Sequence, residues 1–194
     1  MENFVNWSNW LAEQRAVRLN NNLHRNRLTY AGRQGVDYTN NNEALVNFSS
    51  NDYLGLAGHP ELAECLAESA KLHGVGSGAS HMVCGHHELH QQLETALASF
   101  VGSQRVLIFS SGYMANIGLP QALTGRGDLI LSDRLNHASL IDGVRLSHAK
   151  TKRFQHRDVN HAQRISSSAD YQRCLLVTDG VFSMDGDIAP ISEL

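Results

Sequence analysis

The sequence has few cysteines and no long apolar run, and each shortage excludes a class of protein. No apolar stretch approaches the ~18 residues that a membrane-spanning helix needs. The first residues show no basic segment followed by an apolar one, so we expect no targeting signal. The three cysteines, Cys65, Cys84 and Cys174, stand far apart and form no CxxC pair, which favours a reducing cytoplasm over a disulfide framework.

An excess of positive charge is also missing. The formal net charge is -3 at pH 7, so the composition indicates neither nucleic acid nor an anionic membrane surface as a partner. The 194 residues are 42% hydrophobic and 18% charged. These values are typical of one globular domain or of part of a larger one.

The first part of the chain contains two predicted helices and a small hairpin. Residues 1–28 are predicted to form an amphipathic helix with a polar tail, followed by a hairpin within residues 30–48. Pro60 predicts the first turn of a second helix, and Gly74 its end. The apolar positions at helical spacing in the first helix are Phe4, Trp7 and Leu11.

Beyond residue 105, apolar strand candidates recur at a regular interval. They begin at Val106, Asp128, Thr151 and Cys174, which are 22, 23 and 23 residues apart, with a helix-like stretch in each interval. This alternation predicts βαβ units and a mainly parallel sheet. Pro120 falls inside the first of these helices, where we expect a kink or an early end.

Polar loops follow the predicted strands, where parallel sheets bind ligands. The segment Ser110–Tyr113 turns from a strand into a helix, whose open N–H groups favour an anion such as a phosphate. Residues 133–139 and 178–187 should converge on the same edge. His137 has two interpretations: it caps a helix at the sheet edge, or it offers a flat ring to a flat ligand.

Three other motifs fail on inspection. The GxGxG of Gly74–Gly78 follows a helix, whereas a dinucleotide fingerprint follows a strand. His86 and His90 form an i, i+4 pair, but no glutamate directly follows the first histidine and no third ligand is apparent, which favours an ordinary surface helix. Asp185 and Asp187 do not continue into a calcium loop.

Five segments together resemble the α-oxoamine synthases, which are pyridoxal-phosphate (PLP) enzymes of fold type I. The segments are residues 48–56, 76–80, 111–113, 133–140 and 180–187. The resemblance runs along essentially the whole chain in the right order. It implies an α/β fold, with an N-terminal arm and helix over residues 1–45 and part of the large PLP-binding, mainly parallel-sheet domain over residues 46–194.

The resemblance also implies an activity. The wording of the first and last motifs favours the family member that condenses L-alanine with a pimeloyl thioester, of CoA or a carrier protein, with decarboxylation, in biotin biosynthesis. Such an enzyme would be a cytoplasmic homodimer. One alternative is another α-oxoamine synthase, similar to 2-amino-3-ketobutyrate CoA ligase. A second is a non-catalytic PLP-binding half-chain that needs a complementing chain.

Specific residues carry the implied roles. His137 would stack on the cofactor ring and act on the substrate carboxylate, as the catalytic residue. The implied cofactor-binding residues are Gly112, Tyr113, His137, Asp179 and Ser183. The implied substrate-binding residues are Arg25, Asn51, Ser80 and His137. No metal is implied.

The sequence departs from the family pattern at several residues and in one absence. Ala79, His81 and Cys84 stand where glycine, arginine and serine are common in the family. Asp179 stands where the family usually has glutamate, which shortens the reach of the carboxylate. The lysine that should bind PLP covalently is not recognisable, since Lys71, Lys150 and Lys152 do not follow a strand in a Gly-rich setting. We therefore expect an N-terminal portion, inactive alone, that binds PLP weakly, folds with poor stability and leaves the Val106 strand without its neighbours.

Overall fold

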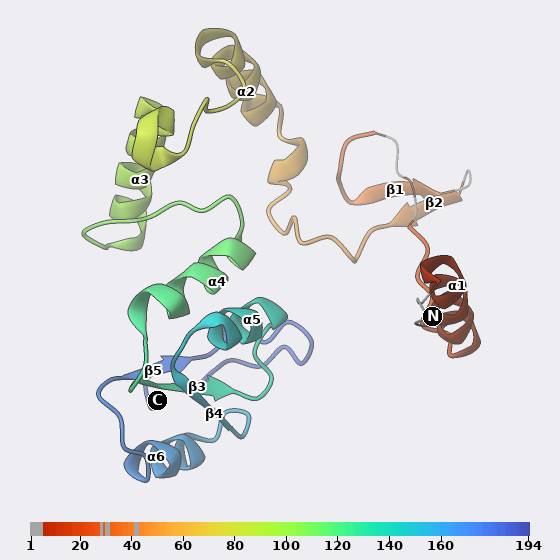
Figure 1. The fold of residues 1–194 in the computed structure, drawn as a ribbon. Coiled ribbons are helices and arrows are strands. Elements are labelled where there is room, and N and C mark those ends of the chain that lie inside the picture. The colour runs from red at the N-terminus through yellow and green to blue at the C-terminus, as the bar shows by residue number, and fades with distance from the viewer. Residues whose placement is uncertain (1–5, 28, 30–31, 41–42) are drawn as a thin grey trace. The chain divides into compact units, whose positions relative to one another are not determined.

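The computed structural model describes residues 6–27, 29, 32–40 and 43–194, so the prediction for Phe4 lies outside the described residues (Figure 1). The chain divides into two compact units, residues 1–77 and 78–194, and each is considered by itself. The domain boundary predicted at residue 45 stays a prediction. Within the described ranges, no helix has both the length and the apolarity to cross a membrane.

The first unit contains the predicted helices and hairpin. Its elements are α1 (Trp7–Asn20), β1 (Asp37–Asn40), β2 (Glu43–Val46), the short 3-10 helix η1 (Leu56–Gly58) and α2 (Pro60–His73). The Asn6 side chain caps α1 by accepting N–H bonds from the first turn. β1 and β2 pair antiparallel, which confirms the hairpin. Pro60 begins α2 and Gly74 ends it at φ 80°, as predicted.

The second unit is an α/β layer structure. Its elements are η2 (His81–Gly85, a π-helical turn), α3 (Glu88–Val101), α4 (Gly112–Leu123), β3 (Leu129–Asp133), α5 (Ala138–Leu146), β4 (Lys150–Phe154), α6 (Val159–Ser167) and β5 (Cys174–Val177). The three strands form a parallel sheet in the order β4-β3-β5, which confirms the parallel sheet predicted from their spacing.

The core of this unit lies on both faces of the central strand β3, whose five residues are all buried. On one face Leu129 and Leu131 pack with Phe154 and with Ala162 of α6. On the other face Ile130 packs with Val144 of α5 and with Val177. α6 and α5 therefore cover opposite faces of the sheet (Figure 1).

One predicted strand does not form. Residues 104–109, which include the apolar segment from Val106, have no regular secondary structure. A strand satisfies its backbone N–H and C=O groups only through a neighbour, and no described strand pairs with this segment. The strand prediction at Val106 is therefore wrong, although its apolar pattern matches that of the strands that do form.

A kink or an early end was predicted at Pro120, and the early end is wrong, because α4 continues to Leu123 with Pro120 buried inside it. The kink stays a prediction. Proline has no N–H, so the carbonyl of Asn116 loses its usual helical donor. Gly143 of α5 lies against that carbonyl, since a Cβ added to Gly143 would stand 2.1 Å from the Asn116 oxygen. α5 therefore packs directly on α4 at the carbonyl that Pro120 leaves without a helical donor.

Candidate active site

His137 is held at the carboxyl edge of the sheet. It follows β3 and is the N-cap of α5, where its Nδ1 accepts the N–H of Ser139 at 3.2 Å. The same Nδ1 lies 2.7 Å from the Ser139 hydroxyl, and that hydroxyl accepts a bond from Asn116 Nδ2 at 3.0 Å. Because Nδ1 is an acceptor, we assign the proton of the neutral ring to Nε2. The capping interpretation of His137 is confirmed, and its exposed ring leaves Nε2 able to donate.

The loop after β5 binds the backbone of His137. Asp179 Oδ2 accepts the N–H of His137 at 2.6 Å, and the N–H of Asp179 donates to Asn136 Oδ1 at 3.0 Å. Asn136 is buried and donates from Nδ2 to Ser132 Oγ and to the carbonyl of Val177. The shorter carboxylate at position 179 therefore still joins the ends of β3 and β5, through a backbone group.

The turn into α4 offers the anion-binding geometry expected from the sequence. Ser111 caps α4, with its Oγ accepting the N–H of Met114 at 3.3 Å. The N–H groups of Gly112 and Tyr113, at the start of the helix, have no intrahelical acceptor. No atom outside the turn lies within 4 Å of a Cβ built on Gly112, so the space above the helix end is open. This turn suits a phosphate group.

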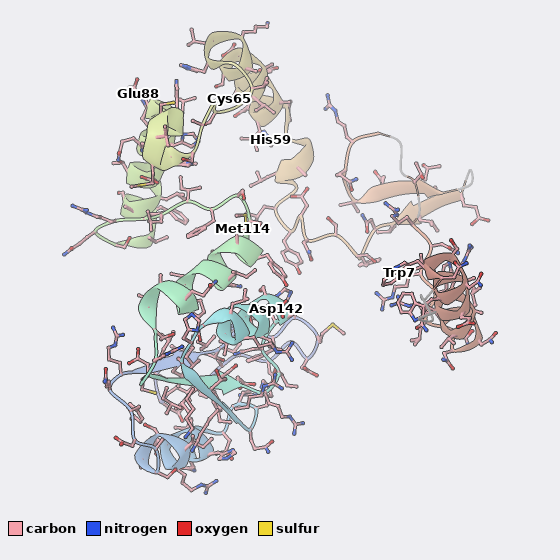
Figure 2. All side chains as sticks on the ribbon, in the orientation of Figure 1. Trp7, His59, Cys65, Glu88, Met114 and Asp142 are labelled. Carbon is pink, nitrogen blue, oxygen red and sulfur yellow. The ribbon has the colours of Figure 1, made fainter. Side chains whose placement is uncertain are left out.

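Tyr113 joins the α4 turn to α5. Its hydroxyl donates to the carboxylate of Asp142 on α5, which Figure 2 labels. This hydrogen bond, with a smaller effect of burial, raises the pKa of Tyr113 above its usual value. The phenol therefore stays protonated, and α4 and α5 are linked twice, by this contact and by the Asn116–Ser139 bond.

A second polar cluster at the same sheet edge escaped the sequence analysis. The buried carboxylate of Asp133, at the end of β3, accepts bonds from the N–H groups of Leu135 and Arg157, and lies 3.0 Å from His156 Nδ1. His156 Nε2 lies 3.1 Å from Asp187, which also accepts from Arg157 Nη1. His156 follows β4 as His137 follows β3, and this equivalent position was the available signal.

The cluster shifts the pKa values of two of its members. Burial lowers the pKa of His156, but the hydrogen bonds to Asp133 and Asp187 outweigh it, so the net pKa is raised above 6.5. The hydrogen bond from His156 lowers the pKa of Asp187 below 3.8, with Arg157 adding to the effect. The hydrogen bonds of the cluster therefore favour the charged forms of both His156 and Asp187.

These shifts predict how stability depends on pH. The stabilisation from charged His156 is fully present below the ordinary histidine pKa and is lost as the pH rises through the raised folded-state pKa. That from Asp187 is present above the ordinary aspartate pKa and is lost as the pH falls through the lowered one. Urea unfolding across this range should show an alkaline decline that His156→Gln removes and that His148→Gln, at an exposed histidine, retains. An equal decline in all three proteins would contradict the assignment.

The remaining predicted site residues lie at separate places. Ser183 is in an exposed turn after β5, and Ser80 precedes η2, where its carbonyl accepts two N–H bonds. Arg25 lines a pocket of about 570 Å³ that also contains Arg15 and Arg18. Arg25 and Asn51 belong to the first unit, so their relation to His137 stays a prediction.

The lysines of the sheet lie at its other edge. Lys150 is the first residue of β4 and pairs with Leu129, the first residue of β3. Lys152 is two residues further along β4. His137 follows the opposite, carboxyl end of the strands, so neither lysine is at the edge that carries the candidate site.

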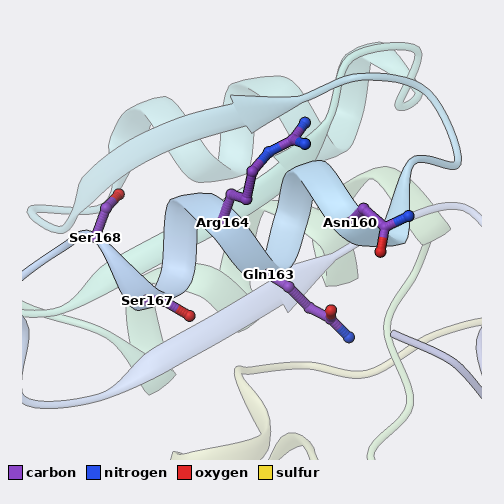
Figure 3. Close-up of a pocket in the computed structure, with 5 residues that line it drawn as sticks. All are labelled: Asn160, Gln163, Arg164, Ser167 and Ser168. Atoms are coloured by element: carbon purple, nitrogen blue, oxygen red, sulfur yellow. The ribbon is translucent and has the colours of Figure 1, made fainter.

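A pocket of about 590 Å³ lies along α6 (Figure 3). The residues that line it are Asn160, Gln163, Arg164, Ser167 and Ser168. They come from one helix and its end, and they include no carboxylate, histidine or thiol that could move a proton. The pocket therefore offers no acid–base pair, unlike the sheet edge around His137.

Comparisons with known proteins find relatives along most of the chain. The family model "Aminotransferase class I and II" matches residues 43–194. The 8-amino-7-oxononanoate synthase of Nitrosomonas europaea is 50% identical over 184 residues, which are 95% of this chain and 48% of that protein. The chain thus spans about half the length of the curated relatives that it matches.

Solved structures share the fold. A serine palmitoyltransferase from S. paucimobilis, with bound PLP and myriocin, has a TM-score of 0.85 at 28% identity. The match covers 95% of this chain and 48% of the palmitoyltransferase chain. The 8-amino-7-oxononanoate synthase of Francisella tularensis has a TM-score of 0.63 at 32% identity. The match covers 75% of this chain and 40% of the synthase chain.

Proposed function

The chain belongs to the aminotransferase class I and II family and has the α/β fold of PLP-dependent fold type I enzymes, and we propose that it is the amino-terminal half of an 8-amino-7-oxononanoate synthase. The reaction condenses L-alanine with a pimeloyl thioester, of CoA or a carrier protein, and releases carbon dioxide. The observation that carries the proposal is the position of His137, whose exposed ring lies at the carboxyl edge of the sheet and is linked through Ser139 to Asn116 of α4. The identity of 50% to a synthase of this name supports it.

The residues present fit PLP. The open space at Gly112 and the free N–H groups of Gly112 and Tyr113 suit its phosphate. The flat ring of His137 suits stacking on the pyridine, and we propose Ser183 and Asp179 as further cofactor contacts. When bound, PLP supplies an electron sink that stabilises the carbanion left when the alanine Cα proton departs.

The residues of this chain position and polarise the substrate. His137 Nε2–H can donate to the alanine carboxylate, since Ser139 and Asn116 hold Nδ1 as an acceptor and so keep the proton on Nε2. Asp179 fixes the backbone from which the ring projects. We propose Arg25, Asn51 and Ser80 as further substrate contacts.

The proposal extends to partners and location. We propose that the whole enzyme is a homodimer and that it works in the cytoplasm. The three cysteines, Cys65, Cys84 and Cys174, are all free and exposed, as suits a reducing compartment.

The test of this proposal begins with the chain alone. After incubation with PLP and reduction with borohydride, we expect no stoichiometric adduct on Lys71, Lys150 or Lys152 by peptide mass analysis. Absorbance titration should show weak non-covalent PLP binding that His137→Ala reduces further. A stoichiometric adduct on Lys150 or Lys152 would contradict the proposed arrangement, because those lysines lie on β4, away from the candidate site edge.

The second part of the test separates the alternatives. The carboxy-terminal half of the Nitrosomonas europaea relative is added, and amino-ketone formation is measured with L-alanine and a pimeloyl thioester. Activity with this pair, and not with glycine and acetyl-CoA, supports the proposed reaction. The opposite preference favours a relative of 2-amino-3-ketobutyrate CoA ligase. PLP binding without any turnover favours a non-catalytic half-chain.

A further inference from the structure

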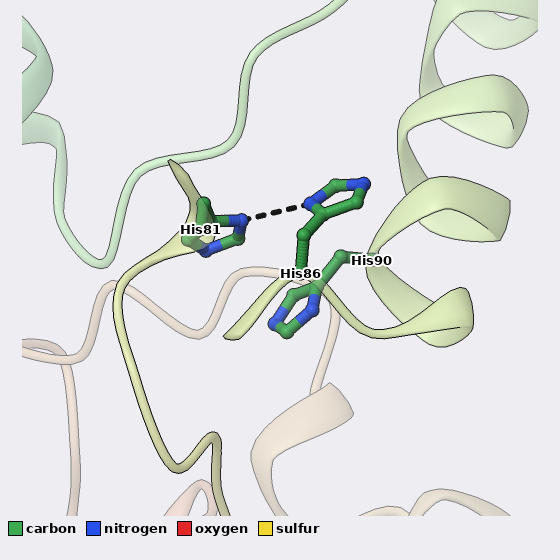
Figure 4. Close-up of side chains that lie close together, drawn as sticks. All are labelled: His81, His86 and His90. Atoms are coloured by element: carbon green, nitrogen blue, oxygen red, sulfur yellow. Dashed lines mark hydrogen bonds between the residues drawn. The ribbon is translucent and has the colours of Figure 1, made fainter. Parts of the chain in front are cut away.

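Three histidines gather where η2 meets α3, and none of them belongs to the candidate active site. His81 begins η2, His86 follows it, and His90 lies in the first turn of α3. One ring nitrogen from each lies within 4.8 Å of the other two (Figure 4). His81, which the sequence analysis did not identify as a third candidate ligand, therefore lies beside His86 and His90 across the turn.

The backbone of the turn fixes this arrangement. Gly85 donates its N–H to the carbonyl of Ser80 at 2.9 Å. A Cβ added to Gly85 would stand 1.7 Å from the carbonyl oxygen of Ala79, so only glycine fits here. The closed turn brings residues 81 and 86 into contact, and such π-helical turns are rare and often occur at functional sites.

The rings contact one another directly. His81 Nδ1 lies 2.9 Å from His86 Nδ1, and the ring centres of His81 and His90 are 4.6 Å apart. His86 and His90 stack with an interplanar angle of 23°. A neutral imidazole has one N–H and one lone pair, so three rings at this spacing can turn three lone pairs toward one point.

We propose that His81, His86 and His90 bind a divalent transition-metal ion. Zinc–nitrogen bonds of 2.0–2.1 Å in a tetrahedral site place ligand nitrogens about 3.3 Å apart. The separations here, from 2.9 Å to at most 4.8 Å, bracket that value, and two of the three histidines are exposed. An all-imidazole set suits zinc, copper or nickel rather than magnesium or calcium, and water completes the coordination.

Metal binding has a local cost and a local benefit. His90 Nδ1 accepts the N–H of His87 at 3.0 Å. A metal bound to Nδ1 would use the same lone pair, and a metal bound to Nε2 would require the ring proton on Nδ1, so ligation by either nitrogen ends this hydrogen bond. In return, the ion joins η2 to α3, so it should raise the unfolding temperature of the chain in proportion to its occupancy.

Zinc titration of the full chain tests the site. The protein, without an affinity tag and stripped with a chelator, is titrated with Zn²⁺ against a chromophoric indicator. We expect one ion per chain, with affinity reduced at least about tenfold in each of His81→Ala, His86→Ala and His90→Ala. His148→Ala and Cys84→Ser should bind as the unchanged chain does. Unchanged affinity in any of the three cluster variants would overturn the proposal.

Cobalt substitution provides a measurement that needs no variant to fold. Co²⁺ bound to the unchanged chain should give the intense visible bands of a tetrahedral ion, without the charge-transfer band of a thiolate. Weak octahedral bands, or a thiolate band that Cys84→Ser removes, would overturn the three-histidine assignment. Absence of one-to-one binding of either metal would mean that the histidines form only a hydrogen-bonded cluster.

Discussion

Replacement of Gly143 by alanine is expected to destabilise the second unit by about 2–3 kcal/mol. Helix propensity alone predicts the opposite, since alanine is favoured over glycine inside a helix by about 1 kcal/mol. The steric clash is the larger effect, so the substitution lowers stability. The new Cβ would stand 2.1 Å from the Asn116 oxygen and 3.0 Å from Ile117 Cα, and both are backbone atoms of α4 that no rotamer change can move.

Gly118 provides the matched control for this substitution. It lies inside α4, where an added Cβ would meet only Phe109 Cε1 at 3.6 Å, an ordinary contact. Gly118→Ala should therefore leave stability unchanged or raise it. Urea unfolding followed by circular dichroism compares the two variants. Equal stability of Gly143→Ala and Gly118→Ala would show that α4 and α5 do not approach as closely as described.

The same contact explains why sequence reasoning failed at Pro120. A proline inside a helix costs about 3 kcal/mol when considered locally, which predicted a kink or an early end. The helix continues because α4 packs closely on α5 around Gly143, and tertiary packing can override a local helix penalty. Gly143 lies 23 residues further along the chain, in another helix, so no local pattern could reveal this packing.

Apolar spacing predicted β3, β4 and β5 but could not distinguish them from the segment at Val106. Apolar residues report that a segment tends to be buried, and the all-buried β3 is the extreme case. Strand formation also requires a hydrogen-bonding neighbour, which depends on tertiary structure. The segment at Val106 has the apolar pattern of a strand, but no described strand lies beside it to pair with its backbone, so it does not form one.

The part of the candidate site around His137 was predictable, because its residues lie in the loops that directly follow predicted strands. The loops after β3 and β5 were predicted to converge, and the bond from His137 N–H to Asp179 joins them. His156 was missed because its partner Asp187 lies 31 residues away and pairs with it only through the register of three strands. The approach of His81 to His86 and His90 was missed similarly, because the HExxH motif considers spacing within one helix and not across a π-helical turn.

Replacement of Asp133 by alanine should be the most damaging change at the sheet edge, with a loss of about 3 kcal/mol or more. Its side chain is 1% exposed. Removal would leave the N–H groups of Leu135 and Arg157 without an acceptor and would take one of two carboxylate partners from His156. Arg157 has a left-handed φ of 59°, a strained value for a non-glycine residue that the bond to Asp133 helps to hold.

Asparagine at position 133 separates the loss of charge from the loss of acceptors. Asp133→Asn keeps one acceptor oxygen but turns an NH₂ group toward a donor, so its loss of stability should be intermediate. Asp170→Ala, at an exposed aspartate, should remain within about 0.5 kcal/mol of the unchanged chain. Urea unfolding measures all three, and amide exchange at residues 155–158 should accelerate most in Asp133→Ala. If Asp133→Ala were as stable as Asp170→Ala, the carboxylate would not hold the loop after β4, and the His156 network would be only a surface contact.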